Sequence, residues 1–461
     1  MKLKELFSAK DMTVGTPWKR ILEFALPMLL GNFAQQLYNT VDSIVVGKVV
    51  GDNALAAVGS AAPILNLLLA LLVGISTGAG IVVSQSFGAK DREGLTKAVG
   101  NCIALSAIAT LVIMVVGPLI SMPMLTMLGT PDSIIGWCAE YLNIYFWGIA
   151  GFFFYNMLSG VLRGMGDSFT ALVFLLISAA LNVALDLLFV SRMGVAGVAL
   201  ATVLAQGFSA ILCYIKLKGM TNVFTLNLKT IRINPRVSGR ILRVGIPSGI
   251  TQAIMAAAGM VVLNLTNAMG ETVIACNVII MRVDGFAMLP NFTFGQALSV
   301  YTGQNVGAGK FDRVTKGMKQ GTAMALALSG TVTFVLMFLS KYLFGLFTDT
   351  QSLIELATRM IRVMAVGYLC IAVSQCLGGV MRGAGDTVTP MWISMLQTIF
   401  IRIPLAYWLA DLTRSAEYPV GQPIALFGSL MAGWCVGMVV SAIVFSMGRW
   451  KKKMMAGHTA M

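Results

Sequence analysis

Two carboxylates in this sequence stand inside long apolar segments, each of them four residues after a polar side chain. Asp186 follows Asn182, and Asp42 follows Tyr38. At this spacing both members of a pair lie on one face of a helix. An ionisable group inside a bilayer is costly to keep, so a carboxylate that persists there is a candidate for binding a cation or a proton.

The polar residues that lead up to Asp42 repeat with the period of a helix. They recur at steps of three and four residues and are Asn32, Gln35, Gln36, Asn39, Asp42 and Ser43. A stripe of this kind is too polar to face lipid. We therefore expect it to face a cleft or the inside of a helix bundle, where it could also contact a substrate.

The two carboxylates are expected at one depth. Asp42 precedes Lys48 by six residues, and Asp186 precedes Arg192 by the same number. A helix rises about 1.5 Å per residue, so each acid would lie about 9 Å inside the nearest charged position. Acids at one depth could share a coupling ion, either H⁺ or Na⁺, and Asn182 would join them as a ligand of Na⁺. The alternative is that each acid is a buried hydrogen-bonding group between helices.

The composition is that of a protein that crosses a membrane many times. Hydrophobic residues make up 57% of the 461-residue chain and charged residues 11%, against about 25% charged residues in soluble domains. We predict an all-α polytopic membrane protein with twelve transmembrane helices. The predicted spans are 21–46, 54–87, 98–128, 134–162, 168–190, 194–215, 244–267, 272–304, 320–340, 352–381, 388–410 and 424–448.

The chain repeats itself after 219 residues. Gln85 and Gly88 return as Gln304 and Gly307, and the motif Arg163–Asp167 returns at Arg382–Asp386. Such a duplication predicts two pseudo-symmetric six-helix bundles, an amino-terminal lobe of residues 1–230 and a carboxy-terminal lobe of residues 231–461. In transporters, a substrate site commonly lies between repeats of this kind.

Lysine and arginine are distributed unevenly over the loops. With twelve spans, the side that holds both termini carries 25 of the 33 basic residues, and the opposite side carries four. By the positive-inside rule both termini are cytoplasmic, in a multi-pass protein of the cell's plasma (inner) membrane. We expect no nucleic-acid partner, because the basic residues are scattered along short loops beside the spans.

Several chemistries are excluded by the residue types. The seven cysteines all fall inside predicted spans without metal-ligand spacing, and the single histidine, His458, stands in the tail. The chain has no nucleotide-binding loop, so transport would have to use an ion gradient. Gly164–Asp167 imitates the signature of an intramembrane aspartyl protease, but the motif is duplicated in short turns and lacks its partner. We therefore expect no enzyme, no cofactor and no metal site apart from the coupling ion.

The second lobe has different ionisable residues. Leu405 stands where the repeat of Asp186 would be, and Arg402 lies near that level. We read Arg402 as structural in preference to substrate-repelling. Asp284 lies two residues after Arg282, and this spacing fits either a structural ion pair or a role in substrate binding.

Five segments of the chain resemble the multidrug and toxic compound extrusion (MATE) family, and the resemblance extends over about residues 15–450. They are Tyr38–Gly47, Gly88–Lys90, Leu162–Asp167, Leu181–Asp186 and Gly303–Gly309. The resemblance implies a V-shaped, twelve-helix transporter of two lobes that exports organic cations against an inward gradient of H⁺ or Na⁺.

The resemblance also implies a site. In the DinF-like branch of the family, which keeps its acids in the amino-terminal lobe, the ion and drug site corresponds to Tyr38 with Asp42 and to Asn182 with Asp186. Further substrate contacts correspond to Tyr141, Asn156 and Thr202. Another branch has a Glu in the seventh span, but residues 250–265 contain no acid. A sodium site of that type is therefore not expected.

The sequence thus predicts a secondary active multidrug antiporter for amphipathic organic cations, working by alternating access as a monomer among membrane lipids. The alternative is a lipid-linked saccharide flippase of the same superfamily. An anionic head group would require a cationic cleft, and the sequence indicates an acidic one with Arg402 alone on the opposite side.

Overall fold

The computed structural model describes residues 7–49 and 52–459, apart from the side chains of residues 39, 41–49, 52–56 and 456–459. Helices make up nearly all of this part. Those of the amino-terminal half are α2 (Pro17–Val49), α3 (Asp52–Gly88), α4 (Arg92–Met127), α5 (Asp132–Trp147), α6 (Ile149–Gly164), α7 (Ser168–Met193) and α8 (Val195–Lys218).

The carboxy-terminal half follows the same pattern with more interruptions. Its elements are α9 (Pro235–Ala268), α10 (Glu271–Ala287), α11 (Leu289–Gly307), α12 (Phe311–Phe338), α13 (Ser340–Gly345), α14 (Gln351–Ala365), α15 (Gly367–Gly383), α16 (Val388–Met395), the π-helix η1 (Leu396–Arg402), α17 (Ile403–Leu412), α18 (Ile424–Ser446) and α19 (Arg449–Thr459).

The twelve predicted spans are confirmed. Among the residues that the structure describes, nine helical segments are long and apolar enough to cross a membrane, and two bent helix pairs bring the number to eleven. The remaining span is α2, whose 33 residues are long enough to cross but carry the polar stripe. The protein is therefore an all-α, multi-pass membrane protein of two six-helix lobes.

Two spans that were expected to be continuous are bent, and they are equivalent in the two lobes. The pair α5 and α6 bends by 51°, and the pair α14 and α15 bends by 41°. Each bend contains a glycine pressed against a neighbouring helix: a Cβ on Gly148 would lie 2.1 Å from the Val203 side chain, and one on Gly367 would lie 2.5 Å from Trp434. These glycines are 219 residues apart, so the bend was duplicated with the lobe.

The eleventh span is interrupted by the π-helix η1, which ends at Arg402. Pro404 follows two residues later and has no N–H to donate, so regular α-helical bonding is lost just before it. The wider turn changes the direction of the side chains of this span, including Gln397 and Arg402.

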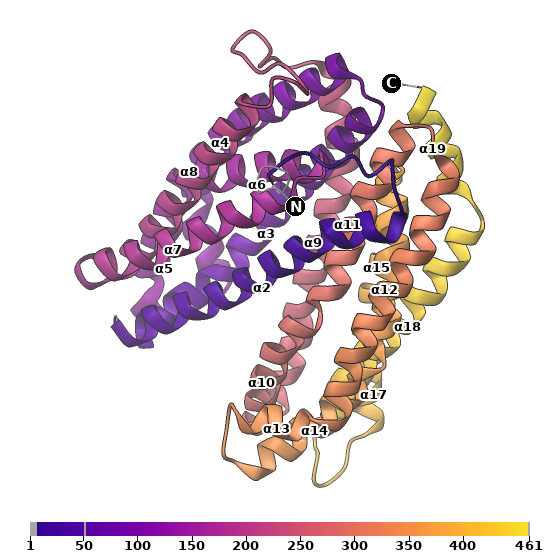
Figure 1. Cartoon of the computed structure of the whole chain (residues 1–461). Coiled ribbons are helices and arrows are strands. Elements are labelled where there is room, and N and C mark those ends of the chain that lie inside the picture. The colour runs from indigo at the N-terminus through magenta and orange to yellow at the C-terminus, as the bar shows by residue number, and fades with distance from the viewer. Residues whose placement is uncertain (1–6, 50–51, 460–461) are drawn as a thin grey trace.

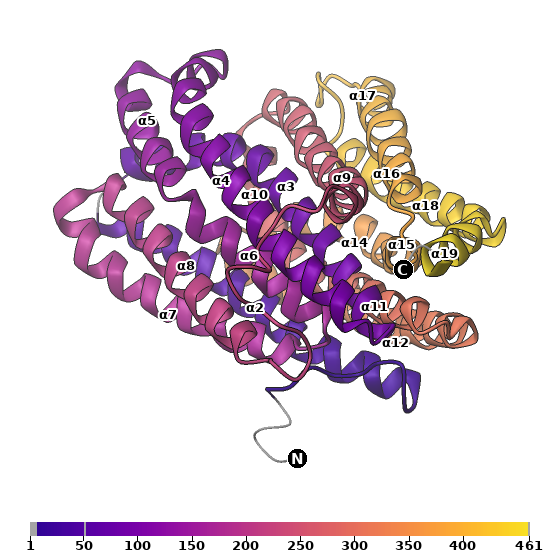
Figure 2. The same ribbon diagram turned by 90° about the horizontal axis from the view of Figure 1, so that it is seen from above.

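The two lobes meet at the end of the molecule that carries both termini, here called the terminal end, and their helices diverge toward the other end (Figure 1). Each lobe has its own apolar core. Seen from above (Figure 2), α4, α5, α7 and α8 lie on one side and α15 to α18 on the other, with α3, α9 and α11 between them. The exact boundary between the lobes at residue 230 stays a prediction.

Helix α2 is shared by the two lobes. In its first half, Ile21, Phe24 and Met28 pack with Phe294 and Leu298 of α11 in the carboxy-terminal lobe. Helix α2 also packs along α7 of the amino-terminal lobe, where the Ser168 hydroxyl donates to the Phe24 carbonyl oxygen at 2.8 Å. A relative movement of the lobes must therefore change the contacts of α2 on one side or the other.

Glycines allow α3 and α9 to approach closely across the lobe boundary. A Cβ added to Gly74 would lie 2.2 Å from the Cα of Gly249, and one added to Gly78 would lie 2.6 Å from the Cα of Gly245. Each helix thus presents two glycines four residues apart, the spacing that lets membrane helices bring their backbones together.

A pair of duplicated glutamines joins the lobes at the terminal end. Gln85 Nε2 of α3 donates to the carbonyl oxygen of Gly383 at 2.9 Å, and Gln304 Nε2 of α11 donates to that of Gly164 at 3.1 Å. We call these two reciprocal contacts the glutamine clamp. They explain why the Gln and Arg-Gly islands return together in the sequence.

Glycines at the same place bring the backbones of α3 and α11 together. A Cβ on Gly88 would lie 1.9 Å from the Gln304 carbonyl oxygen, and one on Gly307 would lie 1.9 Å from that of Gln85. A side chain at either position would force the two helices apart.

Candidate functional site

The carboxylate of Asp186 lies in a cluster formed by three helices of the amino-terminal lobe. With the Asn182 amide of α7 assigned so that its nitrogen faces acceptors, this nitrogen donates to Asp186 Oδ2 at 2.8 Å and to the Tyr38 hydroxyl of α2 at 3.1 Å,. The amide oxygen of Asn182 accepts from the backbone N–H of Thr202 on α8 at 3.0 Å. Four of the residues predicted for the site are therefore together; we call them the amino-lobe cluster.

Among the residues whose side chains the structure describes, this cluster places neutral hydrogen-bonding groups around the Asp186 carboxylate. Asn182 and Asp186 are each 1% exposed. A carboxylate in such a place keeps its charge only while hydrogen bonds or a bound cation compensate for the lost water. Binding of a proton or a small cation by this carboxylate stays a prediction.

Asp42 and Asn39 lie on α2, but their side chains are outside the described part of the structure. The predicted sharing of an ion between Asp42 and Asp186 thus stays a prediction. Within the described residues, no group of three or more His, Cys, Asp or Glu side chains could hold a metal ion.

Two residues of the polar stripe of α2, Asn32 and Gln36, face the carboxy-terminal lobe. Asn32 Nδ2 donates to Thr293 Oγ1 of α11 at 3.0 Å. The Gln36 amide lies 2.7 Å from the position of a Cβ on Gly285 of α10. These residues contact the carboxy-terminal lobe, whereas Tyr38 turns toward α7. Gln35, between them in sequence, is half-buried.

Two further predicted substrate residues lie elsewhere in the amino-terminal lobe. Tyr141 is buried in the lobe core, with its ring centroid 6.2 Å from that of Tyr145. Asn156 donates to the Phe152 carbonyl oxygen at 2.8 Å and lines a separate cavity between the lobes. Their role in substrate binding stays a prediction.

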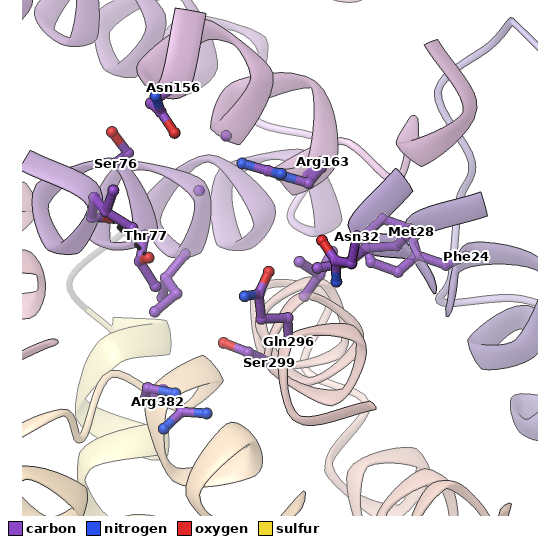
Figure 3. Close-up of a pocket in the computed structure, with 15 residues that line it drawn as sticks. Phe24, Met28, Asn32, Ser76, Thr77, Asn156, Arg163, Gln296, Ser299 and Arg382 are labelled. Atoms are coloured by element: carbon purple, nitrogen blue, oxygen red, sulfur yellow. Dashed lines mark hydrogen bonds between the residues drawn. The ribbon is translucent and has the colours of Figure 1, made fainter. Parts of the chain in front are cut away.

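That cavity has a volume of about 190 Å³ and takes its walls from both lobes. Figure 3 shows Asn32, Ser76, Thr77 and Asn156 on the amino-lobe side, and Gln296 and Ser299 of α11 facing them. Arg163 and Arg382 also line it. The sequence marked both arginines as duplicated, but their meeting at one cavity could be seen only once the lobes were placed together.

This finding corrects the expectation that Arg402 is the only cation between the lobes. Two arginines face the interlobe cavity, one from each lobe. Arg402 instead interacts with Asp284 inside the carboxy-terminal lobe. The surroundings of the lobe interface are therefore basic at the terminal end.

The carboxy-terminal lobe has an acid cluster of its own, which we call the carboxy-lobe cluster: Asp284, Tyr368 and Arg402. The Tyr368 hydroxyl donates to Asp284 Oδ1 at 2.6 Å, and the Arg402 guanidinium is near enough to stabilise the charged carboxylate. The ion pair considered between Arg282 and Asp284 is not formed, because Arg282 is exposed on a different face of α10. Tyr368, 84 residues away in sequence, gave no local signal of this contact.

Comparison with known proteins supplies a family and a fold. The MatE family model matches residues 27–188 and, again, residues 247–408. Two proteins of Bacillus subtilis are similar over nearly the whole chain. The "Probable multidrug resistance protein YoeA" is 27% identical and covers 90% of this chain and 92% of its own length. The corresponding figures for the "Probable multidrug resistance protein YpnP" are 28%, 96% and 98%.

A solved structure with the same fold is described as the outward-facing conformation of a multidrug resistance MATE family transporter of the MOP superfamily. It superposes with a TM-score of 0.87 at 22% identity, covering 95% of this chain and 97% of that one. At this identity the likeness establishes the fold alone.

Proposed function

Since this chain belongs to the MatE family, we propose that it exports amphipathic organic cations in exchange for H⁺ or Na⁺. As a member of that family it is a multidrug efflux transporter and not an enzyme. The finer assignments, namely the cationic substrate class, the antiport and the ion, are the proposal. The observation that carries them is the buried carboxylate of Asp186 held by Asn182 and Tyr38.

The cluster favours a cationic substrate or ion for an electrostatic reason. A buried carboxylate attracts a positive charge strongly where little water screens it. A proton or Na⁺ on the same oxygens removes that attraction. Substrate and coupling ion would therefore compete for one acid, and each could bind only after the other has left. This competition is the minimum that an exchange mechanism needs.

Asp42 belongs to the proposed site through its spacing in the sequence. It follows Tyr38 by four residues on α2. We propose that it forms the second acid of the site, so that Asp42, Asp186 and Asn182 would together ligate Na⁺ if sodium is the coupling ion. The position of the cluster between α2, α7 and α8 then lets ion binding alter how α2 packs.

Alternating access would proceed by parting the lobes at the terminal end and closing them at the other. In the present arrangement the glutamine clamp and the glycines of α3 and α11 hold the terminal end together. We propose that this end is cytoplasmic, as the distribution of basic residues predicts, and that the arrangement is outward-facing. The transporter would work as a monomer in the plasma membrane.

The test uses purified protein in liposomes, with ethidium as the organic cation and a pH gradient or a Na⁺ gradient imposed separately. Ethidium should move in the direction opposite to the downhill flow of either H⁺ or Na⁺. Asp186→Asn and Asp42→Asn should each reduce this gradient-driven movement by about 100-fold. The gradient that drives movement names the ion.

The matched control is Asp411→Asn, which removes an exposed acid that pairs only with Arg414 at 3.1 Å. It should transport like the unaltered protein. Gradient-driven export that persists in both Asp186→Asn and Asp42→Asn would contradict the proposed site. Export under neither gradient, by protein that still binds ethidium, would contradict antiport.

A further inference from the structure

Arg163 and Arg382 occupy equivalent positions of the internal repeat and line one cavity between the lobes. Figure 3 shows them on opposite sides of the space into which Gln296 and Ser299 of α11 project. Each arginine stands near the terminal end of its helix, α6 or α15, one residue before a glycine whose carbonyl oxygen belongs to the glutamine clamp.

Few protein groups satisfy these two guanidinium groups. Arg163 donates to Ser159 Oγ at 3.3 Å. Within the part of the chain that the structure describes, neither arginine forms an ion pair, and Arg382 forms no hydrogen bond to a protein atom. A guanidinium has five N–H donors and stays charged, so protein groups leave most of the hydrogen-bonding capacity of these two arginines unused.

The acids of the same motif are already engaged. Asp167 begins α7 and accepts from the backbone N–H of Thr170 at 3.0 Å and from its hydroxyl at 2.7 Å. Asp386 accepts from the Thr389 hydroxyl and from Lys453 Nζ, each at 2.7 Å. Neither carboxylate is therefore available to balance the arginine of its own motif.

Other basic residues at the terminal end do have partners. Arg240 donates to Gln85 Oε1 at 2.6 Å. Arg313 donates to Asn305 Oδ1 at 3.1 Å and to the Gly15 carbonyl oxygen at 2.8 Å. The shortage of partners thus distinguishes the two cavity arginines from these two half-buried arginines of the same end.

We propose that the interlobe cavity binds an anion between Arg163 and Arg382, and that a phosphate group is the chemistry it suits. Two uncompensated charges in a partly enclosed space within a membrane protein are costly unless an anion joins them. Arginine presents paired N–H groups that match phosphate oxygens. Asn32 and Asn156 line the space on one side, and the Gln296 amide and the Ser299 hydroxyl of α11 offer further donors.

The volume is compatible with such a group. The cavity of about 190 Å³ is many times the roughly 10–15 Å³ that one water molecule needs, so it accommodates a phosphate with some water. The phosphate could belong to a soluble anion or to the head group of a phospholipid. Because one arginine comes from each lobe, the bound anion would favour the arrangement in which the terminal end is closed. This proposal is independent of the ion and the substrate of the amino-lobe cluster.

The first arm of the test measures binding of soluble phosphate by the full chain in detergent. The unfolding temperature, followed by tryptophan fluorescence, is recorded while sodium phosphate replaces sodium chloride at constant ionic strength. Phosphate should raise it. Arg163→Gln and Arg382→Gln should each weaken the apparent phosphate affinity by about tenfold or more. Arg192→Gln, which changes an exposed arginine at the opposite end of α7, should leave it unchanged.

The second arm tests a phospholipid head group. The protein is taken from nanodiscs of mixed phosphatidylglycerol and phosphatidylcholine, and retained lipid is identified by native mass spectrometry. Retention of phosphatidylglycerol that is lost in both Gln variants supports the proposal with lipid as the source, and a response to soluble phosphate alone supports it with a soluble anion.

The proposal is overturned if neither phosphate nor phosphatidylglycerol binds, or if both Gln variants bind as the unaltered protein does. It is also overturned if only one of the two Gln substitutions weakens binding. Should a Gln variant aggregate, Arg163→Lys and Arg382→Lys take its place. The lysine variants keep the charge but lose the paired N–H groups of arginine. They should therefore bind phosphate more weakly than the control variant Arg192→Gln.

Discussion

The amino-lobe and carboxy-lobe clusters surround an acid inside the membrane-spanning region in different ways. Asp186 has a neutral amide and a phenol nearby, whereas Asp284 has a phenol and the Arg402 guanidinium. An acid near a fixed cation has part of its charge compensated and gains less from a further positive charge. An acid among neutral donors still attracts one. The difference supports the proposal that exchange of ions belongs to the amino-terminal lobe and that the carboxy-lobe cluster is structural.

Neither cluster has a counterpart at the equivalent positions of the other lobe. The equivalents of Asn182 and Asp186 in the second lobe are Ile401 and Leu405, and the equivalent of Asp284 in the first is Leu65. Duplication preserved the bends and the clamp, which are features of packing. It did not preserve the acids, so the lobes could take on different roles within one frame.

The largest expected effect is a difference in export between variants of the two acids. Asp284→Asn should reduce gradient-driven ethidium export by no more than about twofold, whereas Asp186→Asn should reduce it by about 100-fold. The liposome assay measures both, with equal protein incorporation as the control. If Asp284→Asn abolished export while the protein stayed folded, the carboxy-lobe cluster would have to take part in coupling and the comparison would fail.

The close contact between α3 and α11 beside the glutamine clamp should be equally sensitive to a change in either helix. Gly88→Ala and Gly307→Ala each add a methyl group that would lie 1.9 Å from a carbonyl oxygen of the other lobe, so closure at the terminal end should become strained and export should fall by about tenfold. Labelling of a cysteine introduced near this end should increase in parallel.

The control is Gly259→Ala in α9, where an added Cβ would meet no atom within 4 Å. It should change neither export nor labelling. If export fell in only one of Gly88→Ala and Gly307→Ala, the two sides of the contact would differ in their contribution to closure.

The smallest expected effect concerns the two tyrosines. Tyr368→Phe removes the hydroxyl that donates to Asp284 at 2.6 Å, and should lower the free energy of unfolding by about 1 kcal/mol with little change in export. Tyr38→Phe should slow export with little loss of stability, because Asn182 still donates to Asp186. Unfolding in detergent and the liposome assay together measure both. The reverse pattern would exchange the roles assigned to the clusters.

Much of the site followed from helical spacing. Asn182 and Asp186 lie on one face of α7 as the four-residue interval predicts, and Tyr38 was placed with them by the resemblance. Thr202 also joined the cluster. The carboxy-lobe cluster did not follow, because Tyr368 and Arg402 reach Asp284 from other spans. The bends at Gly148 and Gly367 were missed because each depends on a side chain of a neighbouring helix.

The sequence by itself determined the membrane class, the twelve spans and the duplication, because hydropathy, charge and repetition are properties of residues along one chain. Tertiary structure alone decided which side chains of different spans meet. The glutamine clamp, the division of α2 between the lobes and the joint position of Arg163 and Arg382 all depend on how helices from separate parts of the chain cross. Those crossings are fixed by contacts between distant residues, which the spacing of residues along a single helix does not encode.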